Sequence, residues 1–237
     1  MILVFVEQEQ GKPDRSSLEA LMAAGRVASA GGSGEPVGAV LFGPGAAVAA
    51  AGLGDYGVAE ANVAEEARLA AYAPAAWGRG VAQLAVNLAP SIVLAGGTDR
   101  GHEVLAYAAA MSNAPMVANC LEIRPGSTFE VTRQRWGGSL LEEARVDAAG
   151  SETRFLTVAD HAFQPEPAAA AGSVVVKTFT PALSEMDLRV QVVSKVAPEA
   201  GKVSLADARV VVGGGRGVGG AEAFSELEEL ALSLIHI

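Results

Sequence analysis

Residues 2–6 read Ile-Leu-Val-Phe-Val, an unbroken apolar run near the start of the chain that sets the pattern for its fold. A run without polar alternation is typical of a strand buried on both faces, as in a parallel sheet. Similar runs recur at residues 37–42, 91–95 and 117–123, with a weaker one at 57–63. We therefore expect a sheet whose strands are covered on both sides.

Helical patterns separate these runs. The first opens at Ser16, which together with Glu19 fits a capping box ahead of an amphipathic stretch. Two more helices are expected at residues 74–88 and 103–111. Alternation of apolar strands with helices predicts an α/β fold, with a mostly parallel sheet flanked by helices.

From residue 129 onwards the apolar residues alternate with polar ones, which indicates antiparallel strands appended at the sheet edge. These strands are expected at residues 129–134, 138–145 and 154–158. Further strand-like runs cover residues 174–178 and 188–195.

A second domain is expected after a linker at about residues 196–206. Its elements are a strand at 207–212, a glycine-rich loop at 213–217 and an acidic helix at 222–232. One strand and one helix cannot bury both faces of the strand. The interpretation is a first domain of residues 1–200, followed at 207–237 by the truncated start of a second α/β domain.

Composition excludes several classes of function. The chain has 237 residues and a formal net charge of −10, which disfavours binding to nucleic acid and to anionic membranes. Its one cysteine, Cys120, lies in an apolar strand and is expected to be a buried structural thiol, so no internal disulfide can form. No leader peptide or membrane span is recognisable, which favours a cytoplasmic protein without direct membrane insertion.

The loop of Gly213, Gly214, Gly215, Arg216 and Gly217 is the strongest chemical motif. Glycines after a strand let backbone N–H groups approach a phosphate, and the N-terminus of the next helix favours negative charge. Arg216 adds a permanent cation. A tight structural turn explains the same residues, and the pattern alone leaves both interpretations open.

Other polar and aromatic residues have plainer explanations. His102 and Glu103 follow a glycine turn at a strand end, where open α/β sheets bind ligands, but helix capping accounts for them equally well. Asp160 and His161 are expected to be a solvated loop pair rather than part of a hydrolase triad. Trp136 is expected to be a strand aromatic over the sheet edge, with an interaction point as the less common interpretation.

Residues 210–231 resemble the electron transfer flavoprotein alpha subunit family. That family opens its FAD domain with Val-Val-x-Gly-Gly-Arg-Gly, and its next helix carries Phe, Leu and Leu-Ala at the places of Phe224, Leu227 and Leu230-Ala231. Resemblance to the family's N-terminal domain follows in the same order at Glu7, 91–97, 114–115 and 133–138.

The chain departs from the family pattern in places. Residues 105–109 replace a helical segment that often carries an arginine, residues 136–139 replace aromatic-Ala-Gly-Asn, and Asn119 stands where an aspartate is common. The family's later FAD motifs would lie beyond Ile237, so we expect the sequence to be C-terminally truncated.

The resemblance implies a cofactor, a partner and site residues. Arg216 would lie against the flavin ring of FAD and favour its reduced and anionic forms, while Gly214, Gly215 and Gly217 would let the chain approach the cofactor. The first domain would have an adenine nucleotide alpha hydrolase-like, Rossmann-like fold and bind no flavin. It would pack as a heterodimer against a beta subunit that carries AMP.

The function implied by the resemblance is that of an electron carrier, not an enzyme. Electrons would pass from flavin dehydrogenases, such as the acyl-CoA dehydrogenases of fatty acid beta-oxidation, through FAD to a quinone oxidoreductase. The alternative is a non-redox nucleotide-binding or assembly α/β protein that lacks flavin. The presence or absence of the later FAD motifs would discriminate between the two.

Overall fold

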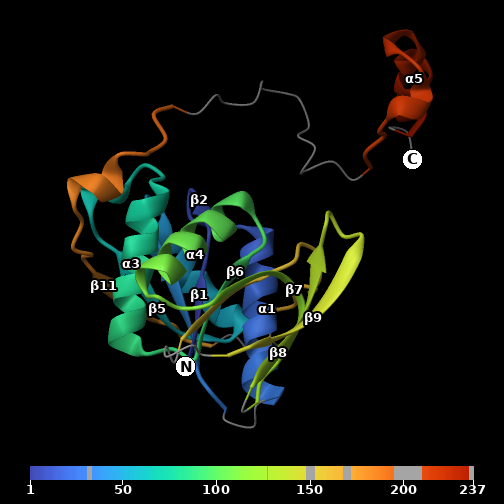
Figure 1. Cartoon of the computed structure of the whole chain (residues 1–237). Coiled ribbons are helices and arrows are strands. Elements are labelled where there is room, and N and C mark those ends of the chain that lie inside the picture. Colours follow the sequence, from blue (N-terminus) through green and yellow to red (C-terminus); the bar gives the residue numbers. More distant parts are fainter. Residues whose placement is uncertain (31–33, 127, 148–152, 168–171, 195–209, 235–237) are drawn as a thin grey trace. The chain divides into compact units, whose positions relative to one another are not determined.

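The computed structural model describes residues 1–30, 34–126, 128–147, 153–167, 172–194 and 210–234. The chain divides into two compact units, residues 1–193 and residues 194–237. The first unit is an α/β fold built on one large sheet, shown from blue to orange in Figure 1.

The large sheet has nine strands in the order β11-β5-β4-β1-β6-β10-β7-β8-β9. All pairings from β11 to β7 are parallel, whereas β8 and β9 extend the sheet by antiparallel pairing. This confirms the expected mostly parallel sheet. The strands are β1 (Ile2–Phe5), β4 (Val37–Leu41), β5 (Val58–Ala64), β6 (Ile92–Gly96), β7 (Met116–Arg124), β8 (Phe129–Arg135), β9 (Leu140–Val146), β10 (Arg154–Val158) and β11 (Val175–Phe179).

Helices cover both faces of this sheet. Helices α1 (Arg15–Ala30) and α2 (Ala46–Ala51) share one core with Ile2 and Val4 of β1. Helices α3 (Pro74–Leu88) and α4 (Asp99–Met111) share the other core with Leu3 and Phe5. Successive residues of one strand thus enter opposite cores, which is why β1 contains no polar residue. Shorter elements are β2 (Gln8–Glu9), β3 (Lys12–Pro13), and the 3-10 turns η1 (Gly52–Tyr56) and η2 (Ala67–Leu69).

The position of β10 corrects the expectation of an antiparallel edge strand at residues 154–158. β10 lies inside the sheet and runs parallel to both β6 and β7. Phe155 and Leu156 are fully buried in opposite cores, and the Thr157 hydroxyl is satisfied by the backbone N–H of Asn119 at 3.0 Å. A strand buried on both faces belongs in the interior of a sheet.

The start of α1 also differs from the expected capping box. Asp14 begins the helix, because its carboxylate accepts the Ser16 N–H at 2.9 Å and its carbonyl accepts the Leu18 N–H. The Ser16 hydroxyl instead donates to Asp160, and Glu19 is buried beneath Arg15 and the backbone of His161. Likewise α4 begins at Asp99, earlier than expected, because Thr98 caps it by accepting the Gly101 N–H at 2.8 Å.

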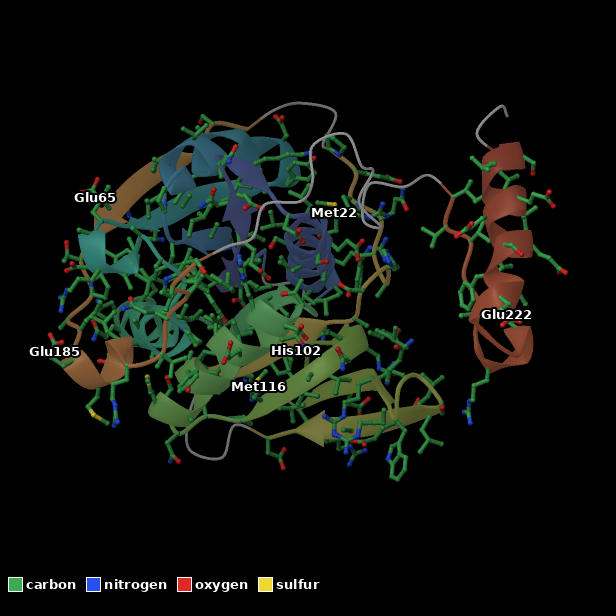
Figure 2. All side chains as sticks on the ribbon, turned by 90° about the horizontal axis from the view of Figure 1, so that it is seen from above. Met22, Glu65, His102, Met116, Glu185 and Glu222 are labelled. Atoms are coloured by element: carbon green, nitrogen blue, oxygen red, sulfur yellow. The ribbon has the colours of Figure 1, made fainter. Side chains whose placement is uncertain are left out.

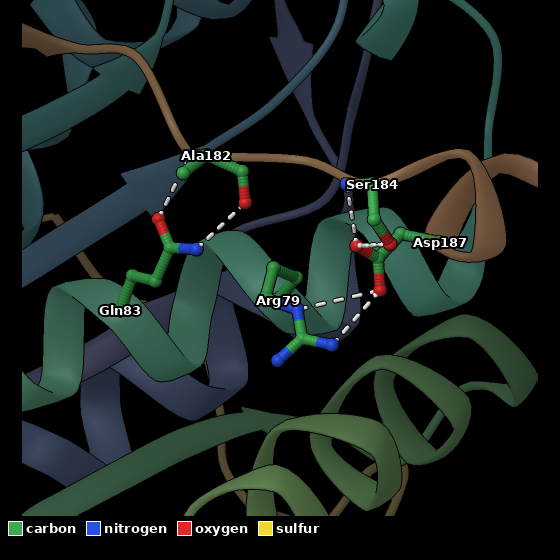
Figure 3. Close-up of polar contacts among 5 residues, drawn as sticks. All are labelled: Arg79, Gln83, Ala182, Ser184 and Asp187. Atoms are coloured by element: carbon green, nitrogen blue, oxygen red, sulfur yellow. Dashed lines mark hydrogen bonds and ion pairs between the residues drawn. The ribbon is translucent and has the colours of Figure 1, made fainter.

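Residues 180–193, here called the strap, cross α3 without forming the strand expected at 188–195. Their one regular turn is η3 (Glu185–Leu188), and Lys195 lies outside the described residues. The Gln83 carboxamide pairs with both backbone groups of Ala182 at 2.8 and 2.9 Å, and Arg79 forms an ion pair with Asp187 at 3.1 Å (Figure 3). Side chains of α3 therefore satisfy the strap's backbone in place of a strand partner.

The second unit is described from residue 210 to residue 234. It contains the 3-10 turns η4 (Arg216–Val218) and η5 (Ala221–Ala223) and helix α5 (Phe224–Leu234), which confirms the expected helix. Residues 207–209 of the expected strand lie outside the described residues, and residues 210–212 are not a strand. A strand needs a hydrogen-bonded neighbour, and the described part of this unit contains no second strand.

None of the helices in the described ranges combines the length and the apolarity that a membrane crossing requires.

Candidate functional site

The carboxyl ends of β1, β6, β7 and β10 gather polar side chains at one edge of the sheet. Glu7 directly follows β1 and is buried, and its carboxylate accepts the hydroxyl proton of Thr98 at the start of α4. Burial raises the pKa of Glu7, and the negative charges of Asp14 and Asp160 add to the effect. The start of a helix favours an anion, and at the start of α4 the carboxylate of Glu7 takes that place.

Two residues expected as ligands or caps, His102 and Glu103, make tertiary contacts instead. Nε2 of His102, labelled on α4 in Figure 2, lies 3.0 Å from Oδ1 of Asn119. Glu103 accepts the Tyr72 hydroxyl at 2.8 Å. The helix is capped by Thr98, so the capping explanation of His102 and Glu103 is wrong.

Asn119 is held in an unusual backbone conformation. Its φ is +60°, and the register of β7 shifts on both sides of the strand near this residue. Bulges of this kind redirect a side chain and are common beside functional sites. Here the bulge lets His102 fix the Asn119 carboxamide beside the end of β10.

A hollow of about 390 Å³ lies between this edge and the turn that joins β8 to β9, and we call it the edge hollow. Its lining includes Gly97, Asn119 and Asp160 from the sheet edge, and Gln134, Arg135 and Trp136 from the hairpin. A Cβ at Gly97 would lie 2.5 Å from the carbonyl oxygen of Val158, so only glycine permits the loops to approach this closely.

Trp136 corrects the expectation of a strand aromatic lying over the sheet. It occupies the β8–β9 turn with φ of +54°, and 80% of its surface is exposed. The glycines that follow it, Gly137 and Gly138, also have positive φ, as a tight hairpin turn of the mirror-image kind requires. The turn therefore holds the indole away from both cores.

Asp160 and His161 form a loop pair, as expected. The Asp160 carboxylate accepts the Ser16 hydroxyl at 2.9 Å, whereas Nδ1 of the exposed His161 lies 3.8 Å from Glu19. The serine hydroxyl therefore contacts a carboxylate and not the imidazole, which is not the order of a hydrolase triad.

Cys120 is fully buried in β7, and burial raises the pKa of its thiol to about 12. Its S–H lies 3.8 Å from the Val117 carbonyl oxygen. A thiol that stays protonated and covered is a packing residue, which confirms the expected structural role.

The glycine-rich loop of the second unit has two kinds of glycine. A Cβ added at Gly214 would lie 2.5 Å from the Leu227 side chain and 3.1 Å from Phe224, so this glycine serves packing against α5. Gly213, Gly215 and Gly217 face open space. Exposed backbone amides beside these three positions can approach a ligand closely.

Arg216 stands in the same loop at the start of η4. Its side chain is exposed, and in the described ranges it forms no ion pair. An uncommitted guanidinium next to accessible amides can bind an anionic group such as a phosphate. The acidic residues of the following helix, Glu226, Glu228 and Glu229, are exposed, as expected for a solvated face.

Sequence patterns did not reveal two features of the sheet edge. Glu7 follows an apolar run and gives no sign that it would be buried, and Trp136 gives no sign that it would be exposed. The paired glycines after Trp136 are the one signal that could have placed it in a turn. Groups of three or more potential metal ligands are absent from the residues the structure describes.

Comparison with known sequences identifies relatives along nearly the whole chain. A profile of the electron transfer flavoprotein domain matches residues 2–184. Proteins named electron transfer flavoprotein subunit alpha are similar: that of Mycobacterium tuberculosis is 34% identical over 98% of this chain and 70% of its own length. That of Mycobacterium leprae is 33% identical over 98% and 69%, and that of Thermoanaerobacterium thermosaccharolyticum is 27% identical over 97% and 69%.

Proposed function

Because the chain belongs to the electron transfer flavoprotein family, and to its alpha subunits, we propose that it is the FAD-binding subunit of an electron carrier. Members of this family carry electrons and are not enzymes. The proposed electron donors are flavin dehydrogenases such as those of fatty acid beta-oxidation, and the proposed acceptor is a quinone oxidoreductase. We place the carrier in the cytoplasm.

One observation supports this proposal above all others. The similarity to alpha subunits covers 98% of the chain for the mycobacterial relatives, so it extends beyond the first unit and into the second. The second unit holds the accessible loop with Arg216. The family match and a loop suited to a nucleotide ligand therefore occur in the same chain.

Within the second unit, Gly213, Gly215, Gly217 and Arg216 are the residues we assign to FAD. Backbone amides of the three open glycines can approach the cofactor, while Arg216 places a fixed positive charge beside it. Gly214 contributes indirectly, because it lets the loop pack on Leu227 and Phe224. Bound flavin supplies one-electron and two-electron redox chemistry. The permanent charge of Arg216 favours the reduced, more negative states.

The first unit is assigned to assembly with a beta subunit, which we propose carries AMP. Glu7 supports this division of roles. Its buried carboxylate lies at the helix starts where an open α/β sheet would receive a phosphate, and a second anion there is electrostatically unfavourable. We therefore propose an assembly domain of residues 1–200 and a flavin-binding domain that begins at 207.

The test is co-expression with the beta subunit of the same organism, followed by measurement of bound flavin and its midpoint potential. Arg216→Ala is expected to lose flavin or to lower its potential, because the fixed charge is removed. Arg216→Lys keeps the charge and is expected to retain part of the effect. Arg189→Ala is the matched control, since Arg189 is an exposed arginine outside the loop whose guanidinium contacts the Met186 sulfur.

Two results would contradict the assignment. Unchanged flavin content and potential in Arg216→Ala would remove Arg216 from the site. A stable complex with the beta subunit that contains no flavin would favour the alternative of a non-redox assembly protein.

A further inference from the structure

We propose that Met186, in the η3 turn of the strap, is a reversible oxidation site that takes an oxygen atom from hydrogen peroxide, and that Arg189 positions the oxidant. The site itself rests on the geometry of the strap. Only the local source of peroxide rests on the proposed function, because peroxide forms when a reduced flavin passes its electrons to dioxygen.

The five methionines of the chain differ in how far they are covered. Met22 packs on one core of the first unit, and Met111 and Met116 pack on the other. Met1 is also half-buried, whereas 66% of the Met186 surface is exposed. The oxidation of a thioether depends on access to its sulfur, so Met186 is the methionine that peroxide reaches most readily.

A guanidinium group lies beside the Met186 sulfur. In a 3-10 turn the side chains at positions i and i+3 lie above one another, and Nη1 of Arg189 lies 3.7 Å from Sδ of Met186. Arg189 is exposed and forms no ion pair within the part of the chain that the structure describes. Its N–H groups are therefore available to an oxygen atom bound at the sulfur.

The turn that carries these two residues is held in place. The backbone N–H of Arg189 donates to the carbonyl oxygen of Met186 at 3.4 Å. Between them, Asp187 ties the turn to α3 through its ion pair with Arg79. Glu185, labelled in Figure 2, begins the same turn and is exposed. Because the backbone is fixed on the side of α3, the guanidinium is kept within reach of the sulfur.

The reaction is a two-electron transfer of one oxygen atom. The sulfur lone pair of Met186 forms the S–O bond while the O–O bond of peroxide breaks. The departing hydroxide takes the proton of the transferred oxygen, so methionine and hydrogen peroxide yield methionine sulfoxide and water. Arg189 donates a hydrogen bond to the departing oxygen as its negative charge develops, and then to the sulfoxide oxygen. Methionine sulfoxide reductases restore the thioether, which makes the modification reversible.

Oxidation changes the strap in a defined direction. The weak contact between a thioether and a guanidinium is replaced by a charge-assisted hydrogen bond to the sulfoxide oxygen. An added side-chain bond between positions i and i+3 stabilises the turn, so the backbone N–H of Arg189 should exchange with solvent about twofold more slowly. The strap thus responds to peroxide by tightening η3.

Peptide mass spectrometry after treatment with hydrogen peroxide gives the oxidation rate of each methionine. In the full chain, alone and in complex with the beta subunit, we expect Met186 to be oxidised faster than the other four. Arg189→Ala should slow the oxidation of Met186 about threefold, the size of an exposed charge interaction, even though it uncovers the sulfur further. Arg189→Lys keeps a cation and should restore part of the rate.

Two further variants serve as controls. Arg26→Ala removes another exposed arginine, whose guanidinium lies 5.0 Å from the centre of the Phe163 ring, and should leave the oxidation rate of Met186 unchanged. Met186→Leu has no sulfur, so peroxide should no longer slow hydrogen exchange at the Arg189 N–H.

Two results would overturn the proposed site. If Arg189→Ala leaves the oxidation rate of Met186 unchanged or raises it, exposure alone sets the reactivity and Arg189 has no part in it. If another methionine of the complex reacts first, Met186 is not the site.

The source of peroxide is tested separately, in the flavin-loaded complex. After photoreduction and exposure to air, Met186 should be oxidised without added peroxide, and catalase should prevent this. A Met186 that stays reduced in a complex that contains flavin would refute this source. A complex without flavin would instead refute the proposed function, and the result with added peroxide would be unaffected.

Discussion

Replacement of Asp187 by alanine is expected to detach the far end of the strap from α3. The Asp187 carboxylate accepts the backbone N–H of Ser184 at 2.9 Å and the Ser184 hydroxyl at 2.8 Å. It also accepts two bonds from the Arg79 guanidinium, from Nε at 3.3 Å and from Nη2 at 3.1 Å (Figure 3). One side chain therefore holds both the turn η3 and its contact with the helix.

The free-energy cost of Asp187→Ala depends on how well the groups that lose their partner can be solvated. Ser184 is exposed and Arg79 is 37% exposed, so both can be rehydrated when the carboxylate is removed. Loss of a helix cap costs about 1 kcal/mol, and loss of a partly exposed ion pair costs up to about 1 kcal/mol. The sum of about 2 kcal/mol corresponds to a roughly 30-fold increase in opening of the strap.

Hydrogen exchange measures this opening at single amides. The Val192 N–H, bonded to the Tyr72 carbonyl at 2.8 Å, should exchange about 30-fold faster in Asp187→Ala. The Ala182 N–H should stay protected, because Gln83 holds it independently. Glu185→Ala removes an exposed carboxylate from the same turn and serves as the control. Unchanged exchange at Val192, or equal acceleration in the control, would refute this account of the strap.

Four further substitutions are expected to change stability or its pH dependence in stated directions. Burial raises the pKa of Glu7 above its ordinary 4.5, so the native state retains a proton that the unfolded state loses. The free energy of unfolding therefore falls as the pH rises from 4.5 through the folded pKa. Glu7→Gln should abolish this fall, as measured by urea unfolding at several pH values. Gly25→Ala on α1 should stabilise the protein by up to about 1 kcal/mol, because the added Cβ meets nothing within 4 Å. Gly78→Ala should destabilise it by about 1–3 kcal/mol, because its Cβ would lie 2.5 Å from that of Tyr107. Effects of the same sign at both sites would contradict this account of the packing. Trp136→Gly should raise the free energy of unfolding by up to about 1 kcal/mol, because glycine relieves the strain at φ +54°. An unchanged or lower melting temperature would contradict that strain.

The core strands could be predicted because local composition determines them. A strand such as β1, buried on both faces, must be apolar at every position, and this pattern is visible without knowledge of its neighbours. Helix α3 was equally predictable, since Pro74 stands at its first position and its bounds are the expected ones.

The order of the strands within the sheet could not be predicted in the same way. Residues 154–158 are apolar enough for a strand, but nothing in them specifies whether they join an edge or enter between β6 and β7. Strand order depends on contacts between segments distant in the chain. Ser16 failed as a cap for a similar reason, because the nearby Asp14 competes for the same amides and Asp160 binds the serine hydroxyl.

At the sheet edge, local sequence indicated residue types but not their surroundings. The buried state of Glu7 depends on Thr98, and the position of Asn119 depends on His102 and Thr157. These partners lie 17 to 91 residues away in the sequence. The glycine-rich loop was recognisable by itself, yet the different packing of Gly214 became visible only through α5.

The insertion of β10 between β6 and β7 has a consequence for synthesis on the ribosome. Strands β7, β8 and β9 leave the exit tunnel before β10, so until residue 158 has emerged β6 has no neighbour on that side and β7 has none toward the core. During this interval β7, β8 and β9 can pair only among themselves. In the nascent chain, two strand edges in the middle of the sheet thus stay unpaired until β10 is inserted between them. Unpaired strand edges favour aggregation.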